Sequence, residues 1–278
     1  MKVNYNGELI AIEEAKFSIE NRAFRYGDGL FETIRYQDGK LLFWEDHYYR
    51  MMGGMCLLRM DIPIHWNMEY LEEELMSLLE ANESSGAMRV RISVFRNDGG
   101  LYTPEDRGAQ FLAECTPLSE NTYQWSDERM EIDVFYDHRK SVSDISNAKT
   151  TNCLIYTLAG IYRKENAIDD AILLNVDNKL VESVSSNLFL IKDDVIYTPP
   201  ISDGCVDGVM RKQLIKLAEE MGKKLEEKSL TSFDMTKADE VFLSNVISGI
   251  TPVTNYKKKE YDTYQTEALW AALIAKLA

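Results

Sequence analysis

The chain has 278 residues, 45% of them hydrophobic, and carries a formal net charge of −15 at pH 7. The length suffices for one large or two modest hydrophobic cores. The acidic surface argues against nucleic acid as a partner. The sequence has no apolar run of about 18 residues, which argues against a membrane as a partner. Four scattered cysteines, three histidines without metal-ligand spacing and a polar N-terminus predict a cytoplasmic protein with free thiols and no metal site.

The first part of the chain mixes strand and helix signals. Asn6-Gly7 between apolar-containing segments predicts a tight hairpin, and Asp38-Gly39 predicts a second one. Apolar side chains at helical spacing predict a helix over residues 66–81. The other elements expected in this part are strands over residues 2–5, 8–12, 30–36, 40–43, 88–95 and 110–115 and a helix over residues 44–56.

A polar stretch without periodicity marks the expected domain boundary. We predict an N-terminal domain of residues 1–117, a linker of residues 118–124 and a C-terminal domain of residues 125–278. Strands and helices mix without strict alternation, so the fold class is predicted to be α+β with two domains. The elements expected in the second domain are strands over residues 130–136, 171–176, 180–191 and 240–244 and helices after Lys149 and over residues 209–221 and 265–277.

Two segments of the second domain carry side chains that suit pyridoxal phosphate (PLP). Lys149 directly precedes an amphipathic helix, and a lysine amine can bind the cofactor's aldehyde covalently. Glu182 lies on an expected strand, and a carboxylate there could hold the pyridine nitrogen protonated. Ser186 and Asn187 follow in an unusually polar stretch, suited to hydrogen bonding around a cofactor. A solvated lysine, an edge glutamate and an ordinary bulge are the structural alternatives for these residues.

Other segments could bind the cofactor's phosphate. Gly208 allows close backbone approach, and the N–H groups of Val209 and Met210 at a helix start are available to an anion. A turn containing Asn245 and Val246 could add further backbone donors. Arg50 is the candidate phosphate cation, although alone it has the character of a surface arginine.

These motifs together resemble the class IV PLP-dependent aminotransferases. That group includes branched-chain and D-amino acid aminotransferases and aminodeoxychorismate lyases. The resemblance runs nearly end to end, through residues 21–33, His47 with Arg50, Lys149 with Asn152, residues 182–189, 208–211 and 250–253. It implies an N-terminal α/β domain, a C-terminal domain with a barrel-like sheet, PLP between the domains and a homodimer.

The same resemblance assigns roles to individual residues. Lys149 would bind PLP covalently, Glu182 would meet the pyridine nitrogen, and Arg50 with the amides of Val209 and Met210 would bind the phosphate. The substrate would be a small amine or amino acid. Candidate substrate contacts are Tyr26, Phe31, Arg96 and Ile247, with Arg96 or Arg25 as a possible carboxylate ligand.

A few positions in the sequence indicate the subfamily. The sequences around Val209-Met210 and Asn245-Val246 look most like the lyases, because many transaminases carry Ile-Thr at the first site and a threonine where Val246 stands. Leu101 stands where the lyases carry arginine, and the arginine and histidine of D-amino acid aminotransferases are absent from this loop. We expect an aminodeoxychorismate lyase that forms 4-aminobenzoate and pyruvate, with a branched-chain-type transaminase as the alternative. A non-catalytic PLP-binding scaffold is disfavoured because Lys149 and Glu182 are both present.

Overall fold

The contacts of the chain divide it into two units. The computed structural model describes residues 1–277. The first unit contains Met1–Thr122 and Ala148–Asn152, and the second contains Tyr123–Asn147 and the residues from Cys153 onward. The division after Thr122 lies within the segment expected to be a linker. The short segment that carries Lys149 groups with the first unit, although the sequence placed it in the C-terminal domain.

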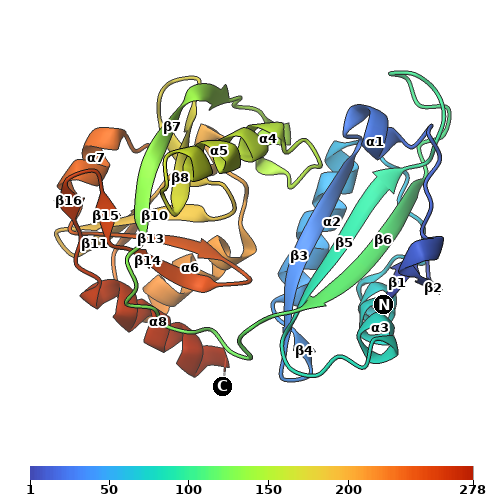
Figure 1. The fold of residues 1–278 in the computed structure, drawn as a ribbon, viewed down its shortest axis with the longest axis horizontal. Coiled ribbons are helices and arrows are strands. Elements are labelled where there is room, and N and C mark those ends of the chain that lie inside the picture. Colours follow the sequence, from blue (N-terminus) through green and yellow to red (C-terminus); the bar gives the residue numbers. More distant parts are fainter. Residues whose placement is uncertain (278) are drawn as a thin grey trace. The chain divides into compact units, whose positions relative to one another are not determined.

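An antiparallel sheet forms the first unit (Figure 1). Its strands lie in the order β2 (Glu8–Ala11), β1 (Lys2–Tyr5), β6 (Ala109–Pro117), β5 (Met88–Arg96), β3 (Gly29–Gln37) and β4 (Lys40–Leu41). Helix α2 (Trp44–Leu57) packs against β3, and helix α3 (Met68–Ala81) packs against β1 and β6. The 3-10 helix η1 (Ile12–Glu14) and the short helix α1 (Arg22–Tyr26) lie between β2 and β3 in the chain.

The core of the first unit lies between this sheet and its helices. Leu30 and Ile34 share one face of β3 because side chains alternate along a strand, and Leu71 and Leu75 repeat at helical spacing on α3. All four side chains are at most 2% exposed and belong to one cluster. The helix predicted over residues 66–81 is thereby confirmed as α3.

The sheet of the second unit branches at one strand (Figure 1). Strand β10 pairs with β11 and β13 and also meets β9. The β7–β8, β7–β15 and β11–β12 pairs are parallel. The strands are β7 (Glu131–Lys140), β8 (Asp170–Asn175), β9 (Leu180–Ser183), β10 (Asn187–Lys192), β11 (Val195–Thr198), β12 (Leu225–Glu227), β13 (Glu240–Asn245), β14 (Gly249–Val253), β15 (Asn255–Tyr256) and β16 (Lys259–Glu260).

Helices surround this second sheet. They are α4 (Asp144–Asn147), α5 (Leu154–Glu165), the 3-10 helix η2 (Ile201–Asp203), α6 (Val209–Glu220), α7 (Ser232–Lys237) and α8 (Tyr264–Leu277). Helix α5 packs on β7 and β8, and α6 packs on β13 and α8. The mixture of antiparallel and parallel strands with helices confirms the predicted α+β class. Within residues 1–277, no helix is long and apolar enough to cross a membrane.

Two departures from the expected strands shape the second unit. The strand expected over residues 180–191 is two strands, because the N–H of Ser183 donates to the carbonyl of Ser186 (2.8 Å) and closes a turn between β9 and β10. The strand expected over residues 130–136 continues to Lys140 as β7, past an irregularity in its pairing with β8 between Phe135 and Arg139. This continuation carries Lys140 into the interior, where it is 6% exposed.

Candidate active site

Backbone hydrogen bonds hold the Lys149 segment against β3. The N–H of Phe31 donates to the carbonyl of Lys149 (2.9 Å), and the N–H of Thr151 donates to the carbonyl of Gly29 (2.9 Å). The Thr151 hydroxyl also donates to the carbonyl of Gly27 (2.8 Å). Lys149 Nζ lies 4.5 Å from the centroid of the Phe31 ring. Lys149 is therefore fixed on both sides along the backbone, beside an aromatic face that limits the water around its amine.

A buried ion cluster on the helix face of β3 surrounds Glu32. Glu32 is 1% exposed and accepts hydrogen bonds from Arg50 Nε (2.7 Å), Arg50 Nη2 (2.5 Å) and His47 Nδ1 (2.7 Å). Burial alone would raise the pKa of Glu32, but the adjacent Arg50 charge and these hydrogen bonds lower it to about 2. Arg50, the predicted phosphate ligand, is thus held in place by a carboxylate to which the sequence assigned no role.

His47 is the neutral member of this cluster. Burial lowers its pKa, and the positive charges of Arg50 and Lys149 act in the same direction against the raising effect of Glu32. Its Nε2 is buried and has no hydrogen-bond partner within residues 1–277. The imidazole therefore donates to Glu32 through Nδ1 and adds no positive charge near Lys149.

The second unit buries a carboxylate of its own. Glu182, on β9, is 4% exposed. Its Oε1 accepts hydrogen bonds from Lys140 Nζ (2.5 Å) and the Tyr156 hydroxyl (2.7 Å), and its Oε2 accepts one from the N–H of Val206 (3.0 Å). Burial and the Glu182 charge strongly raise the pKa of Tyr156, so its hydroxyl stays protonated as a donor. Sequence analysis identified Glu182 but neither Lys140 nor Tyr156.

The predicted residues after Glu182 bind neighbouring loops. Asn187 Nδ2 donates to the carbonyl of Val206 (2.9 Å), and Asn245 Nδ2 donates to Ser186 Oγ (2.8 Å). A Cβ on Gly208 would collide with Asn187 Oδ1, so this position requires glycine for close approach rather than for backbone freedom. Ser186 and Asn187 thus support the loops that lead to α6 and to the β13–β14 turn.

The start of α6 has no side-chain cap. Its N-cap residue, Gly208, makes no side-chain cap, so the first N–H groups of the helix have no capping side chain. The side chains of Val209 and Met210 are 4% and 1% exposed. A phosphate at this end would therefore be bound by backbone groups and the helix dipole rather than by side-chain hydroxyls.

The turn between β13 and β14 offers fewer donors than expected. Asn245 Oδ1 accepts hydrogen bonds from the N–H groups of Ile247 (2.8 Å) and Ser248 (2.9 Å). The Tyr123 hydroxyl donates to the carbonyl of Val246 (2.7 Å), and the Val246 side chain is 8% exposed. Two of the predicted backbone donors are therefore already paired within the turn.

The geometry favours a structural role for Arg96 over the predicted substrate role. Arg96 is 6% exposed and donates to Asp28 Oδ2 (2.9 Å) and Oδ1 (3.1 Å). It also donates to the carbonyls of Leu58 (2.6 Å) and Arg59 (3.2 Å). Arg22 donates to the same Asp28 Oδ2 (2.9 Å). These bonds consume most of the guanidinium's donors in joining β5 to the end of α2.

Both aromatic substrate candidates lie in the first unit, where Tyr26 is half-buried and Phe31 is buried. Tyr26 packs against Tyr102, with ring centroids 5.5 Å apart. The Phe31 ring, 9% exposed, also lies near Arg91, whose guanidinium carbon is 3.7 Å from its centroid. Phe31 thus contacts two cations, Arg91 and Lys149.

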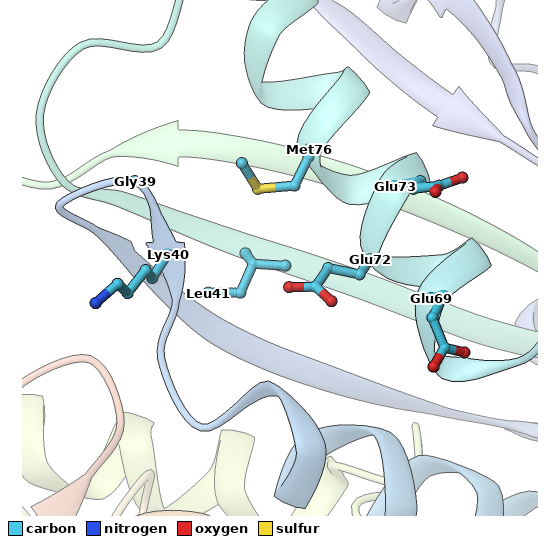
Figure 2. A pocket seen from close by; sticks show the side chains of 7 residues that line it. All are labelled: Gly39, Lys40, Leu41, Glu69, Glu72, Glu73 and Met76. Atoms are coloured by element: carbon cyan, nitrogen blue, oxygen red, sulfur yellow. The ribbon is translucent and has the colours of Figure 1, made fainter.

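A separate open depression of about 550 Å³ lies over α3 and β4 (Figure 2). None of the predicted site residues lines it. Its lining residues are Gly39, Lys40, Leu41, Glu69, Glu72, Glu73 and Met76. Within residues 1–277, no group of three or more histidine, cysteine or acidic side chains is placed to hold a metal ion.

The donor sets of the two units fit the chemical groups of PLP. Glu182 is a buried carboxylate whose Oε2 accepts one backbone bond and can accept another, which suits a protonated ring nitrogen. The uncapped start of α6 suits a phosphate. Lys149 supplies an amine beside an apolar ring, which suits covalent binding of an aldehyde.

Comparisons with known proteins agree with this chemistry. The family model described as "Amino-transferase class IV" matches residues 29–256. The chain is 29% identical over 269 residues to a D-alanine aminotransferase of Bacillus licheniformis, covering 92% of this chain and 88% of that protein. It is 28% identical over 242 residues to an aminodeoxychorismate lyase of Vibrio harveyi, covering 86% and 87%.

Comparison with a solved structure also indicates an aminotransferase fold. The fold is similar to that of a branched-chain aminotransferase from Thermoproteus uzoniensis crystallised with norvaline, with a TM-score of 0.88, 25% identity, and coverage of 98% of this chain and 93% of that one. The family match and the fold identify a PLP-dependent enzyme. The chain belongs to the class IV aminotransferase family.

The lowered pKa of Glu32 predicts a specific loss of stability in acid. Because its pKa of about 2 lies below the ordinary 4.5, ionised Glu32 contributes stability that is lost as the pH falls from about 4.5 toward 2. We expect Glu32→Gln to remove roughly 3 kcal/mol of this pH dependence. Urea unfolding at a series of pH values measures it, with exposed Glu8→Gln as the control. Equal pH dependence in the two variants would contradict the role of Glu32.

Proposed function

We propose that the enzyme is an aminodeoxychorismate lyase, which releases pyruvate and 4-aminobenzoate. The observation that carries the proposal is the apolar character of the phosphate-binding positions. Val209, Met210 and Val246 are all nearly buried, and none offers the hydroxyl that many transaminases place at these sites. The similarity to the Vibrio harveyi lyase supports the same assignment.

In this proposal Lys149 is the covalent attachment point and the base. When bound, PLP supplies an electron sink for the carbon that carries the substrate amine. Lys149 Nζ takes the proton from that carbon, and loss of pyruvate then makes the product ring aromatic. The centroid of the Phe31 ring lies 4.5 Å from Nζ, and the ring helps to position the lysine side chain.

The remaining residues bind the cofactor and orient it. Arg50 binds the phosphate, and Glu32 fixes the plane of its guanidinium through two hydrogen bonds. The first N–H groups of Val209 and Met210 add backbone donors at the helix start. Glu182 holds the proton on the ring nitrogen. Each of these roles rests on family membership together with the local geometry of one unit.

A branched-chain-type transaminase is the second candidate. The likeness to the Thermoproteus uzoniensis aminotransferase favours it. Leu101, which is 74% exposed, also stands where the lyases have an arginine. The two candidates share Lys149 and its partners and differ in the fate of the substrate after the first proton transfer.

Product analysis separates the two reactions. A lyase forms 4-aminobenzoate and pyruvate from aminodeoxychorismate with no keto-acid acceptor, and the cofactor stays in its aldehyde form. A transaminase accumulates the amine form of the cofactor with an amino donor alone. We expect the first result, measured by pyruvate release and by stopped-flow spectra with leucine, alanine and D-alanine. Half-transamination of leucine with no pyruvate from aminodeoxychorismate would overturn the lyase proposal.

Replacement of Lys149 tests the proposed catalytic role directly. We expect Lys149→Ala to lose activity by about 10²–10⁴-fold or more, because the variant lacks its attachment point and its base. Borohydride reduction followed by peptide mapping should place the pyridoxyl group on Lys149 in the wild type. Lys140 serves as the internal control, because its amine is buried in an ion pair. A label on any lysine other than Lys149 would refute the assignment.

We propose a cytoplasmic homodimer as the working form. The four cysteines are free, which fits a reducing compartment. In the second unit, Val142, Ile145, Leu154 and Ile161 around α4 and α5 are between 42% and 72% exposed. Such apolar exposure suits burial against a second copy. Light scattering after size exclusion should give twice the chain mass of 31.9 kDa, and a mass of one chain at micromolar concentration would contradict the dimer.

A further inference from the structure

A second buried lysine contacts the carboxylate assigned to the ring nitrogen. Lys140, at the end of β7, is 6% exposed, and its Nζ donates to Glu182 Oε1 (2.5 Å) and to the carbonyl of Ser146 (3.0 Å). The Nζ also lies 5.3 Å from the centroid of the Tyr156 ring. A lysine is rarely so deeply buried unless it is paired, and this one is paired with Glu182.

The donors around Glu182 are divided unequally between its two oxygens. Oε1 receives both the ammonium of Lys140 and the hydroxyl of Tyr156. Among residues 1–277, Oε2 receives only the N–H of Val206. Each carboxylate oxygen has two acceptor positions. Oε1 is therefore saturated, and Oε2 is the oxygen that can take one more donor.

We propose that Lys140 is a positioning residue for the cofactor, which keeps Glu182 ionised and so holds the shared proton on the ring nitrogen. The proposal rests on the role of Glu182 under the proposed function. It applies to the lyase and the transaminase alike, since both need a protonated ring.

The contact between Lys140 and Glu182 predicts where the proton shared by Glu182 and the ring nitrogen would lie. A proton between Glu182 and a ring nitrogen has two positions, on the nitrogen beside an ionised carboxylate or on Oε2 beside a neutral ring. The Lys140 charge is in direct contact with Oε1 of the carboxylate, whereas a ring nitrogen would bind at the other oxygen, Oε2. It therefore stabilises the anion of Glu182 more than it opposes a charge on the ring. Removal of the charge shifts the proton toward the carboxylate.

The other titratable groups around Glu182 add no second cation that contacts its carboxylate. Tyr156, from α5, stays protonated because burial and the Glu182 charge raise its pKa. Cys205 lies in the loop before α6, and burial followed by the Glu182 charge raises the pKa of its thiol to about 12. The charge of Asp207 raises the pKa of the Cys205 thiol, and the charge of Arg211 lowers it. Lys140 is thus the cation in direct contact with Glu182 among the described residues.

The first experiment observes the ring nitrogen itself. The holoenzyme is prepared with PLP labelled with ¹⁵N at the pyridine nitrogen, and its NMR shift is compared in wild type, Lys140→Met and Lys140→Arg. We expect the protonated value in the wild type and in Lys140→Arg, and a displacement toward the neutral value in Lys140→Met. A protonated value in Lys140→Met would overturn the proposal. If Glu182→Gln also leaves the shift unchanged, the assigned role of Glu182 fails and takes the proposal with it.

The second experiment needs no cofactor and removes the ambiguity of a misfolded variant. Loss of one member of a buried ion pair leaves an uncompensated charge, so Lys140→Met should lower the Tm of the apoprotein by roughly 5–15 °C. The double variant Lys140→Met with Glu182→Gln should recover most of that loss, because no charge remains unpaired. A lysine that stabilises the fold through packing alone predicts no recovery by the second substitution. Equal Tm values for the single and double variants would contradict charge pairing.

Discussion

Each unit of this protein buries a carboxylate, and the candidate chemistry depends on the cations that make this burial tolerable. An unpaired carboxylate in the interior would take up a proton or destabilise the fold by several kcal/mol. Arg50 compensates Glu32 in the first unit, and Lys140 compensates Glu182 in the second. In both cases the carboxylate also orients its partner. Arg50 is held at both Nε and Nη2, and Lys140 directs Glu182 so that Oε2 keeps acceptor capacity.

The sequence predicted what local chemistry determines. Lys149 and Glu182 stand out because each lies in a short motif that can be recognised from its neighbours in the sequence. The amphipathic pattern of α3 and the glycine before α6 are local signals of the same kind. The family resemblance added the order of the motifs, and the comparison with known proteins confirmed the family, the α+β class and the PLP cofactor.

The sequence missed what long-range packing determines. Lys140 follows a strand that was expected to end at residue 136, and only the irregular pairing of β7 with β8 carries it to Glu182. Glu32, on strand β3, had no assigned role because its partners lie 15 and 18 residues away on helix α2. Arg96 was predicted as a substrate ligand on its charge, and the sequence contained no sign of the bonds that its guanidinium makes to Asp28. A single sequence contains no local signal for any of these pairings.

The same constraints explain why related enzymes with different reactions share one scaffold. A lysine base, an ionised carboxylate for a ring nitrogen and a helix start for a phosphate serve every reaction that begins by removing a proton beside an amine. In this chain the candidate residues Lys149, Arg50 and Glu182 are held by backbone bonds or buried ion pairs, which tolerate few substitutions. The loop that carries Leu101 and Tyr102 is held through its backbone, because the buried Arg22 donates to the carbonyls of Leu101 (2.6 Å) and Tyr102 (3.4 Å), whereas the two side chains are exposed. Exposed side chains of this kind can change between related proteins while the buried ion pairs remain as they are.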